Sequence, residues 1–154
     1  CQMENPWTLK GEPVMLSKPE YDWECRGFWV NEGPAVLFHG DKLFISYSAS
    51  ATDENYCMGL LWIDLDADPL TPQNWHKSPR PVFTTSYENR QYGPGHNSFT
   101  QTPEGEDVLV YHARNYTEIE GDPLYDPNRH TRLKLVRWDE NGMPDFGIPP
   151  ADTN

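Results

Sequence analysis

Long apolar segments, regular helical patterns and paired cysteines are all scarce in this sequence. No apolar run reaches the roughly 18 residues that a membrane-spanning helix needs. No segment keeps an apolar period of about 3.6 residues, so the pattern does not predict a helical fold. The cysteines Cys1, Cys25 and Cys57 are odd in number and lack CxxC spacing, which argues against a disulfide framework, a cysteine zinc site and a redox motif.

Positive charge is also in short supply. Lys and Arg total 12 against 24 Asp and Glu, which gives a net charge of -12 and an isoelectric point near 4.6. Such a field repels polyanions, so we expect neither nucleic acid nor a membrane surface as a partner. The negative charge of the protein does not repel a neutral glycan.

The first seven residues do not have the character of a signal peptide and resemble the interior of a domain. This says nothing about export. The sequence leaves the compartment undecided, with a secreted or periplasmic location favoured over a cytoplasmic one.

Aromatic and turn-forming residues are abundant, and they predict an all-β fold. The chain has 6 Trp, 8 Tyr and 6 Phe together with 11 Gly and 15 Pro, a mixture that suits short strands joined by turns. Strand patterns at 35–38 and 42–48 flank a turn at 39–41 and predict a hairpin. Further strands are predicted at 56–63 and 80–84. Exposed rings could also stack on sugars, although core packing explains any single Trp at least as well.

The strand pattern repeats along the chain. Three features recur after 64 to 76 residues: Trp7 with 13–16 and Trp75 with 81–84, residues 47–49 and 111–113, and Trp62 and Trp138. A four-stranded unit repeating at this length is typical of β-propeller blades. Residues 1–154 would then form part of one propeller, with the end of one blade followed by about two blades. Closed propellers need four to eight blades, so we expect a complementary N-terminal half or self-association.

The repeat also brings two ionisable residues into register. Glu32 and His96 are 64 positions apart, and each stands at the start of a first strand. Because the first strand of every blade lines the central channel, both side chains should converge near the axis. A surface or turn role remains the alternative for either residue alone.

Several motifs resemble glycoside hydrolase family 43, and most closely its α-L-arabinofuranosidases. They occur in the family's order and extend the resemblance from about Asn5 to Pro149. The motifs are VNEGPAV at 30–36, YSASAT at 47–52, YCMGLL at 56–61, GPGHNSF at 93–99 and YDPNRHTR at 125–132.

The resemblance implies a five-bladed β-propeller that hydrolyses arabinose- or xylose-containing plant polysaccharides with inversion. Family members use an Asp base, an Asp that tunes the acid, and a Glu acid, and Glu32 in Asn-Glu-Gly-Pro matches the acid. The two Asp residues would lie upstream of Cys1, and no Asp of this chain is expected to replace them. We therefore expect this chain alone to be inactive.

The resemblance also implies roles for three other residues. His96 matches a histidine beside a hydrated calcium or other ion at the propeller centre, although a water-bound or core histidine is an alternative. Arg132, with Arg129 as a second candidate, matches an arginine that reaches the sugar, and a surface ion pair is the alternative. His112 aligns with Ser48 and points either to the channel or to the sheet interior.

The leading hypothesis is thus part of an arabinofuranosidase-like enzyme that acts on an arabinose- or xylose-containing glycan. One alternative is a β-xylosidase or endo-arabinanase of the same family. Another is a non-catalytic carbohydrate-binding half-propeller. Two aspartates at blade starts in an upstream sequence would favour the enzyme.

Overall fold

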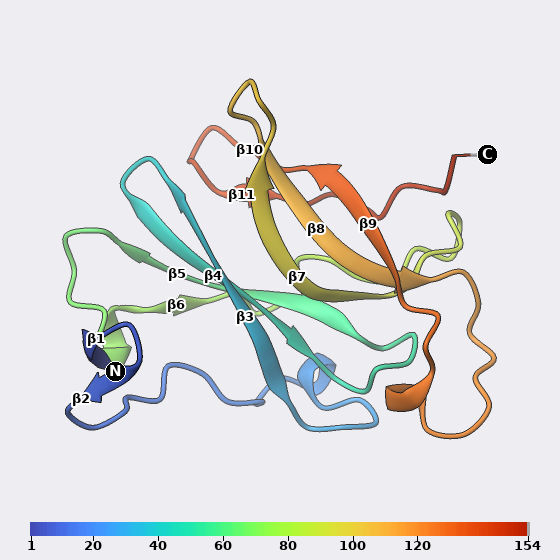
Figure 1. Cartoon of the computed structure of the whole chain (residues 1–154), viewed down its shortest axis with the longest axis horizontal. Coiled ribbons are helices and arrows are strands. Elements are labelled where there is room, and N and C mark those ends of the chain that lie inside the picture. Colours follow the sequence, from blue (N-terminus) through green and yellow to red (C-terminus); the bar gives the residue numbers. More distant parts are fainter. Residues whose placement is uncertain (154) are drawn as a thin grey trace.

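The computed structural model describes residues 1–153 and consists almost entirely of antiparallel strands. In Figure 1 the sheet of β7–β9 lies above and to the right of the sheet of β3–β6, and the β1–β2 hairpin lies at one end of the molecule. The first sheet contains β3 (Asn31–His39), β4 (Lys42–Ala49), β5 (Cys57–Asp64) and β6 (His76–Lys77). The second contains β7 (Tyr92–Gln101), β8 (Asp107–Arg114) and β9 (His130–Leu135). Two small hairpins pair β1 (Gln2–Asn5) with β2 (Thr8–Lys10), and β10 (Arg137–Trp138) with β11 (Pro144–Asp145).

Both sheets have the sequential order of propeller blades, β3-β4-β5-β6 and β7-β8-β9. The predicted all-β class is confirmed, because helix in residues 1–153 is confined to three 3₁₀ turns of three residues each. They are η1 (Asp22–Glu24), η2 (Pro72–Asn74) and η3 (Pro123–Tyr125). None of these turns has the length or the apolar character to cross a membrane. The second sheet departs from the four-stranded expectation, since its described part has three strands.

The predicted hairpin is correct, whereas the predicted fourth strand is not. Strands β3 and β4 pair up to His39 and Lys42, around the expected turn. The fourth strand of the first sheet is His76–Lys77, and residues 80–84 make only an isolated bridge between Met58 and Phe83. Proline has no backbone N–H, so prolines at 79 and 81 remove two of the donors that a continuous ladder would need.

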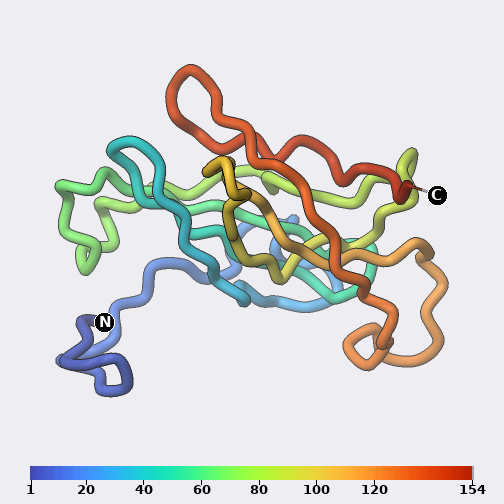
Figure 2. Tube along the Cα trace, turned by 45° about the horizontal axis from the view of Figure 1, so that its top comes forward, coloured from blue at the N-terminus to red at the C-terminus, as the bar shows by residue number. Residues whose placement is uncertain are grey.

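The main core lies between the two sheets. Phe44 and Met58 of the first sheet and Leu109 of the second are each fully buried in one cluster. Phe83 packs edge-on against Tyr111, with ring centroids 4.9 Å apart. Figure 2 shows the sheets packed together, while the N-terminal hairpin projects from them. Burial of these apolar side chains on both faces is the main force that joins the sheets.

Buried hydrogen bonds set the register between the sheets. The backbone N–H of His96 on β7 donates to Ser48 Oγ on β4 at 2.7 Å. Two residues before Ser48 on β4, Ser46 Oγ donates to Oδ1 of Asn97, which directly follows His96 on β7, at 2.9 Å. Both serines are fully inaccessible and Asn97 nearly so, so a shift in register would leave polar groups buried without partners.

A buried carboxylate ties the segment before β3 to the first sheet. The fully buried Glu24 accepts hydrogen bonds from five donors: the backbone N–H groups of Glu20 and Tyr21, the side-chain amide of Asn31, the hydroxyl of Tyr47 and the ammonium of Lys77. Burial raises the pKa of Glu24, but these hydrogen bonds outweigh burial, so its pKa lies below the ordinary value of 4.5. The anion is therefore the stable form, and it fixes the start of β3 through Asn31.

Replacing Glu24 with Gln should destabilise the chain by about 3–5 kcal/mol, because the Lys77 ammonium loses its buried partner. Glu20→Gln is the matched control, since exposed Glu20 contacts the same ammonium at 3.2 Å and should matter by less than about 1 kcal/mol. Because the folded pKa of Glu24 is lowered, its contribution is present above about pH 4.5 and is lost as the pH falls further. Denaturant unfolding of Glu24→Gln should lack this acid-side decline. Equal losses in the two variants would contradict the assignment.

Candidate functional site

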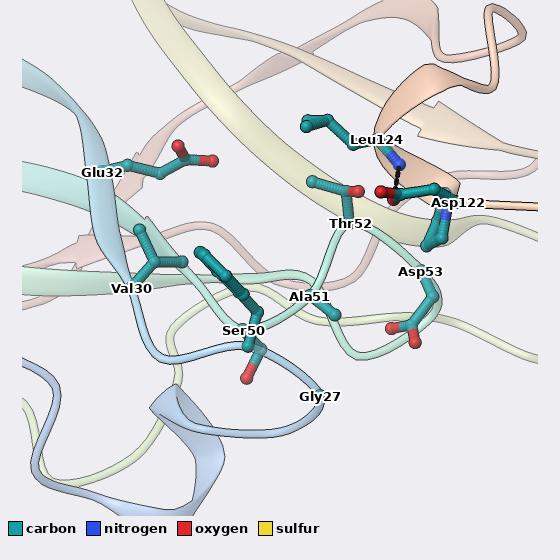
Figure 3. A pocket seen from close by; sticks show the side chains of 11 residues that line it. Gly27, Val30, Glu32, Ser50, Ala51, Thr52, Asp53, Asp122 and Leu124 are labelled. Carbon is teal, nitrogen blue, oxygen red and sulfur yellow. Dashed lines mark hydrogen bonds between the residues drawn. The ribbon is translucent and has the colours of Figure 1, made fainter.

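Glu32 stands at a bulge near the start of β3. The register with β4 shifts between Glu32 and Ala35, and Gly33 takes a φ of 56°. A Cβ at Gly33 would also lie 3.2 Å from the His96 ring. Glycine therefore permits both the backbone turn and the approach of His96. The resulting geometry points the half-exposed Glu32 carboxylate away from the sheet and into a cavity, as Figure 3 shows.

His96 meets Glu32 from the second sheet. It lies in a bulge of β7 with a φ of 45°, an uncommon conformation for a residue other than glycine. Its Nδ1 is 3.9 Å from Glu32 Oε1, and its side chain is 58% exposed. Both residues line one cavity of about 470 Å³, as the repeat predicted.

Tyr56 and His112 lie next to these two residues. The Tyr56 hydroxyl donates to Glu32 Oε1 at 2.6 Å and lies 3.4 Å from His96 Nδ1. The His112 ring stacks on Tyr56 with centroids 5.6 Å apart. Burial, followed by the positive charge of Arg129, lowers the pKa of His112 to about 4. His112 is therefore neutral at neutral pH.

The sequence interpretation missed Tyr56 as a site residue. Residue 56 was predicted as the start of a strand and belongs to the motif at 56–61, but neither observation gave it a role in the site. For His112, the structure selects the channel side of the two orientations left open, because the ring lines the cavity with Glu32 and His96.

The two candidate arginines occupy different places. Arg129 lines the cavity beside Glu32 and donates to the Leu124 carbonyl at 3.1 Å. Arg132 instead donates to backbone carbonyls of β8 and β9 and to Asn115, and its Nη2 lies 3.2 Å from the Asp152 carboxylate. It lines neither hollow beside Glu32, so the structure brings Arg129 to Glu32 and does not bring Arg132 there.

Residues 115–129, between β8 and β9, form one wall of the site. Buried Arg114 holds the base of this loop: it pairs with Asp126 at 3.0 Å and donates to the carbonyls of Pro123 and Thr52. The Thr52 contact joins the loop to the segment after β4. Together the two segments enclose a second hollow of about 460 Å³ beside Glu32, lined also by Phe28 and Leu124.

The described residues do not by themselves form the calcium site expected at His96. Calcium binds six to eight oxygen ligands, whereas the carboxylate paired with His96 is that of Glu32, 3.9 Å away. Within residues 1–153, no group of three or more His, Cys, Asp or Glu side chains is arranged to hold a metal ion. Metal binding by His96 remains a prediction, and no chemical step below depends on it.

Comparison with known proteins decides the family. Residues 1–144 match the sequence model of glycosyl hydrolases family 43. The chain belongs to glycosyl hydrolase family 43. Its two sheets are blades of the family's five-bladed propeller.

Individual family 43 relatives are similar over nearly the whole chain. The extracellular exo-α-(1→5)-L-arabinofuranosidase of Streptomyces avermitilis is 57% identical over 99% of this chain and 32% of its own length. The α-L-arabinofuranosidase 43 of Humicola insolens is 51% identical over 97% of the chain and 31% of its own length. A crystal structure of the α-L-arabinofuranosidase from Lactobacillus brevis superposes with a TM-score of 0.96 at 59% identity, covering 99% of this chain and 47% of that one. The chain thus spans about a third of the length of the curated relatives.

The contact between Gly33 and His96 can be tested with a matched pair of variants. Gly33→Ala and Gly40→Ala both place a side chain at positive φ, which costs about 1–2 kcal/mol. A Cβ at Gly40 would have open space, whereas one at Gly33 would press on the His96 ring. Gly33→Ala should therefore lose more stability and shift the NMR resonances of His96, while Gly40→Ala leaves them in place. Identical behaviour of the two variants would show that the close approach is unimportant.

Proposed function

We propose that this chain supplies the general acid of an inverting glycosidase that releases arabinofuranose from arabinose-containing glycans. The observation that carries the proposal is the Glu32 carboxylate, which projects into a cavity and receives a hydrogen bond from buried Tyr56. The strong similarity to proteins named arabinofuranosidases supports the substrate class. The structure titled as a xylan β-1,4-xylosidase is only 19% identical, and it supports the fold alone.

In this mechanism Glu32 protonates the glycosidic oxygen as the bond to the anomeric carbon breaks. A second carboxylate activates water on the opposite face of the sugar. Arg129, at the same cavity, is placed to donate hydrogen bonds to sugar hydroxyls. The half-exposed position of Glu32 allows it to recover a proton from solvent after each turnover.

The base is expected to come from other blades. Asp53 and Asp122 line the hollow beside Glu32, but both carboxylates are engaged in local turns. Asp53 accepts from the backbone and side-chain N–H groups of Asn55, and Asp122 accepts from the Leu124 N–H. These contacts support a turn-forming role for each, so we assign neither to the reaction.

We further propose that the chain completes its propeller with a complementary N-terminal half. The Lactobacillus brevis enzyme matches this chain over only 47% of its length, which leaves about half of that protein for other blades. Exposed apolar side chains on the sheets, such as Phe38 on β3 and Leu133 on β9, provide surface that neighbouring blades could cover. Secretion is the proposed location, because the Streptomyces avermitilis relative is named extracellular.

Glu32→Gln in the complete propeller tests the acid. Turnover of an arabinofuranoside with a poor leaving group should fall by about 10²–10⁴-fold, because glutamine cannot donate the required proton. A dinitrophenyl arabinofuranoside should lose much less, since its leaving group needs little protonation. Glu104→Gln, in an exposed turn, serves as the control and should leave the turnover of both substrates unchanged. Unchanged turnover of the poor-leaving-group substrate in Glu32→Gln would refute the assignment.

The separate chain should not hydrolyse an aryl arabinofuranoside, because it lacks the proposed base. Adding the N-terminal half should restore activity and give a one-to-one complex by light scattering. Self-association without activity would point to the fold being completed without its catalytic set. A stable, inactive monomer of 17.8 kDa that does not bind the N-terminal half would contradict the proposed assembly.

A further inference from the structure

Tyr56 makes a contact with Glu32 that general acid catalysis alone does not require. Its ring is fully buried, and its hydroxyl donates to Oε1 of Glu32 at 2.6 Å. Among residues 1–153, Glu32 Oε2 has no hydrogen-bond partner. The two carboxyl oxygens therefore differ: one is bound by the protein and the other is open to the cavity.

We infer that Tyr56 positions the acid by binding Oε1, so that Oε2 is the oxygen that carries the proton and delivers it to the glycan. This inference rests on the function proposed above. The reaction itself is unchanged: the Oε2–H bond breaks, the proton joins the leaving oxygen, and Glu32 becomes a carboxylate that solvent later reprotonates.

The phenol can act only as a neutral donor at physiological pH. Burial, and then the hydrogen bond to Glu32, raise the pKa of Tyr56 far above its ordinary value of 10. The hydroxyl has one proton, and the 2.6 Å distance to Glu32 against 3.4 Å to His96 directs that proton to the carboxylate. The phenol oxygen is then left as an acceptor on the side of His96.

This hydrogen bond strengthens as the reaction proceeds. While Glu32 is protonated at Oε2, Tyr56 donates to a neutral carbonyl oxygen. As the proton leaves, Oε1 gains negative charge and the hydrogen bond becomes charge-assisted. An interaction that is stronger at the transition state than before it lowers the barrier.

The second blade holds the Tyr56 ring in position. A Cβ at Gly95 would lie 2.5 Å from Tyr56 Cε1, so glycine lets β7 approach the edge of the ring. His112 stacks on the ring with an interplanar angle of 7°. Because the ring is clamped by β7 and β8, Tyr56→Phe should remove the hydroxyl without moving the aromatic group.

Tyr56→Phe in the complete propeller is the direct test. We expect kcat for a poor-leaving-group arabinofuranoside to fall about 10- to 100-fold, the size of a hydrogen bond to a charged group, with KM nearly unchanged. The loss should shrink for the dinitrophenyl substrate, as it does for Glu32→Gln. Tyr111→Phe is the matched control, because Tyr111 is buried in the second sheet and its hydroxyl has no partner among residues 1–153. Tyr111→Phe should leave kcat for both substrates unchanged.

A merely structural role predicts a different pattern. Equal losses of Tyr56→Phe on both substrates, or no loss on either, would overturn the inference. Site-specific 3-fluorotyrosine at position 56 keeps the hydroxyl and should retain wild-type behaviour, which separates loss of the donor from misfolding. If Glu32→Gln shows the leaving-group dependence and Tyr56→Phe does not, the positioning role alone fails. If Glu32→Gln shows none, the proposed function fails and this inference with it.

Discussion

The site depends on the buried hydrogen bonds that Ser46 and Ser48 make with β7. They fix how far the second sheet can slide along the first, and therefore where His96 stands relative to Glu32. Apolar packing between the sheets supplies the larger share of cohesion, but it has no direction and would tolerate small shifts. Polar groups without access to water do not tolerate them, because each lost partner carries a desolvation cost. The 3.9 Å separation of His96 and Glu32 follows from that register.

A second constraint acts on Glu32 from the other side. The Glu24 carboxylate binds Asn31, the residue directly before Glu32, and is itself held by Lys77 of β6 and Tyr47 of β4. The start of β3 is thus attached to the far edge of its own sheet as well as facing the next one. The Glu32 carboxylate is half exposed, whereas the Glu24 carboxylate, eight residues earlier, is fully buried and anionic. The two glutamates therefore lie in opposite environments although they are close in sequence.

Much of the fold and part of the site could be predicted from the sequence. The hairpin followed from its turn residues, and the meeting of Glu32 and His96 followed from the 64-residue repeat, because equivalent positions in adjacent blades face the same axis. The prediction of a strand at 80–84 was wrong, because the prolines at 79 and 81 lack the backbone N–H groups that a continuous ladder needs, although the segment has an apolar pattern. Tyr56 was not identified as a site residue, because its hydrogen bond to Glu32 joins residues 24 positions apart and sequence periodicity contains no such information. The choice between Arg129 and Arg132 likewise depends on the path of an irregular loop.

The loop of residues 115–129 contains both an anchored part and an exposed part within a short stretch of chain. Its base is secured by the buried Arg114 pair with Asp126, while its outer part presents the exposed Leu124 and Tyr125 beside the hollow. Substitutions of these two exposed side chains would alter the surface beside the hollow without removing the Arg114–Asp126 pair that shapes the loop. Such a segment is well suited to evolutionary diversification, since its exposed side chains can change while the sheets and Glu32 beside it stay intact.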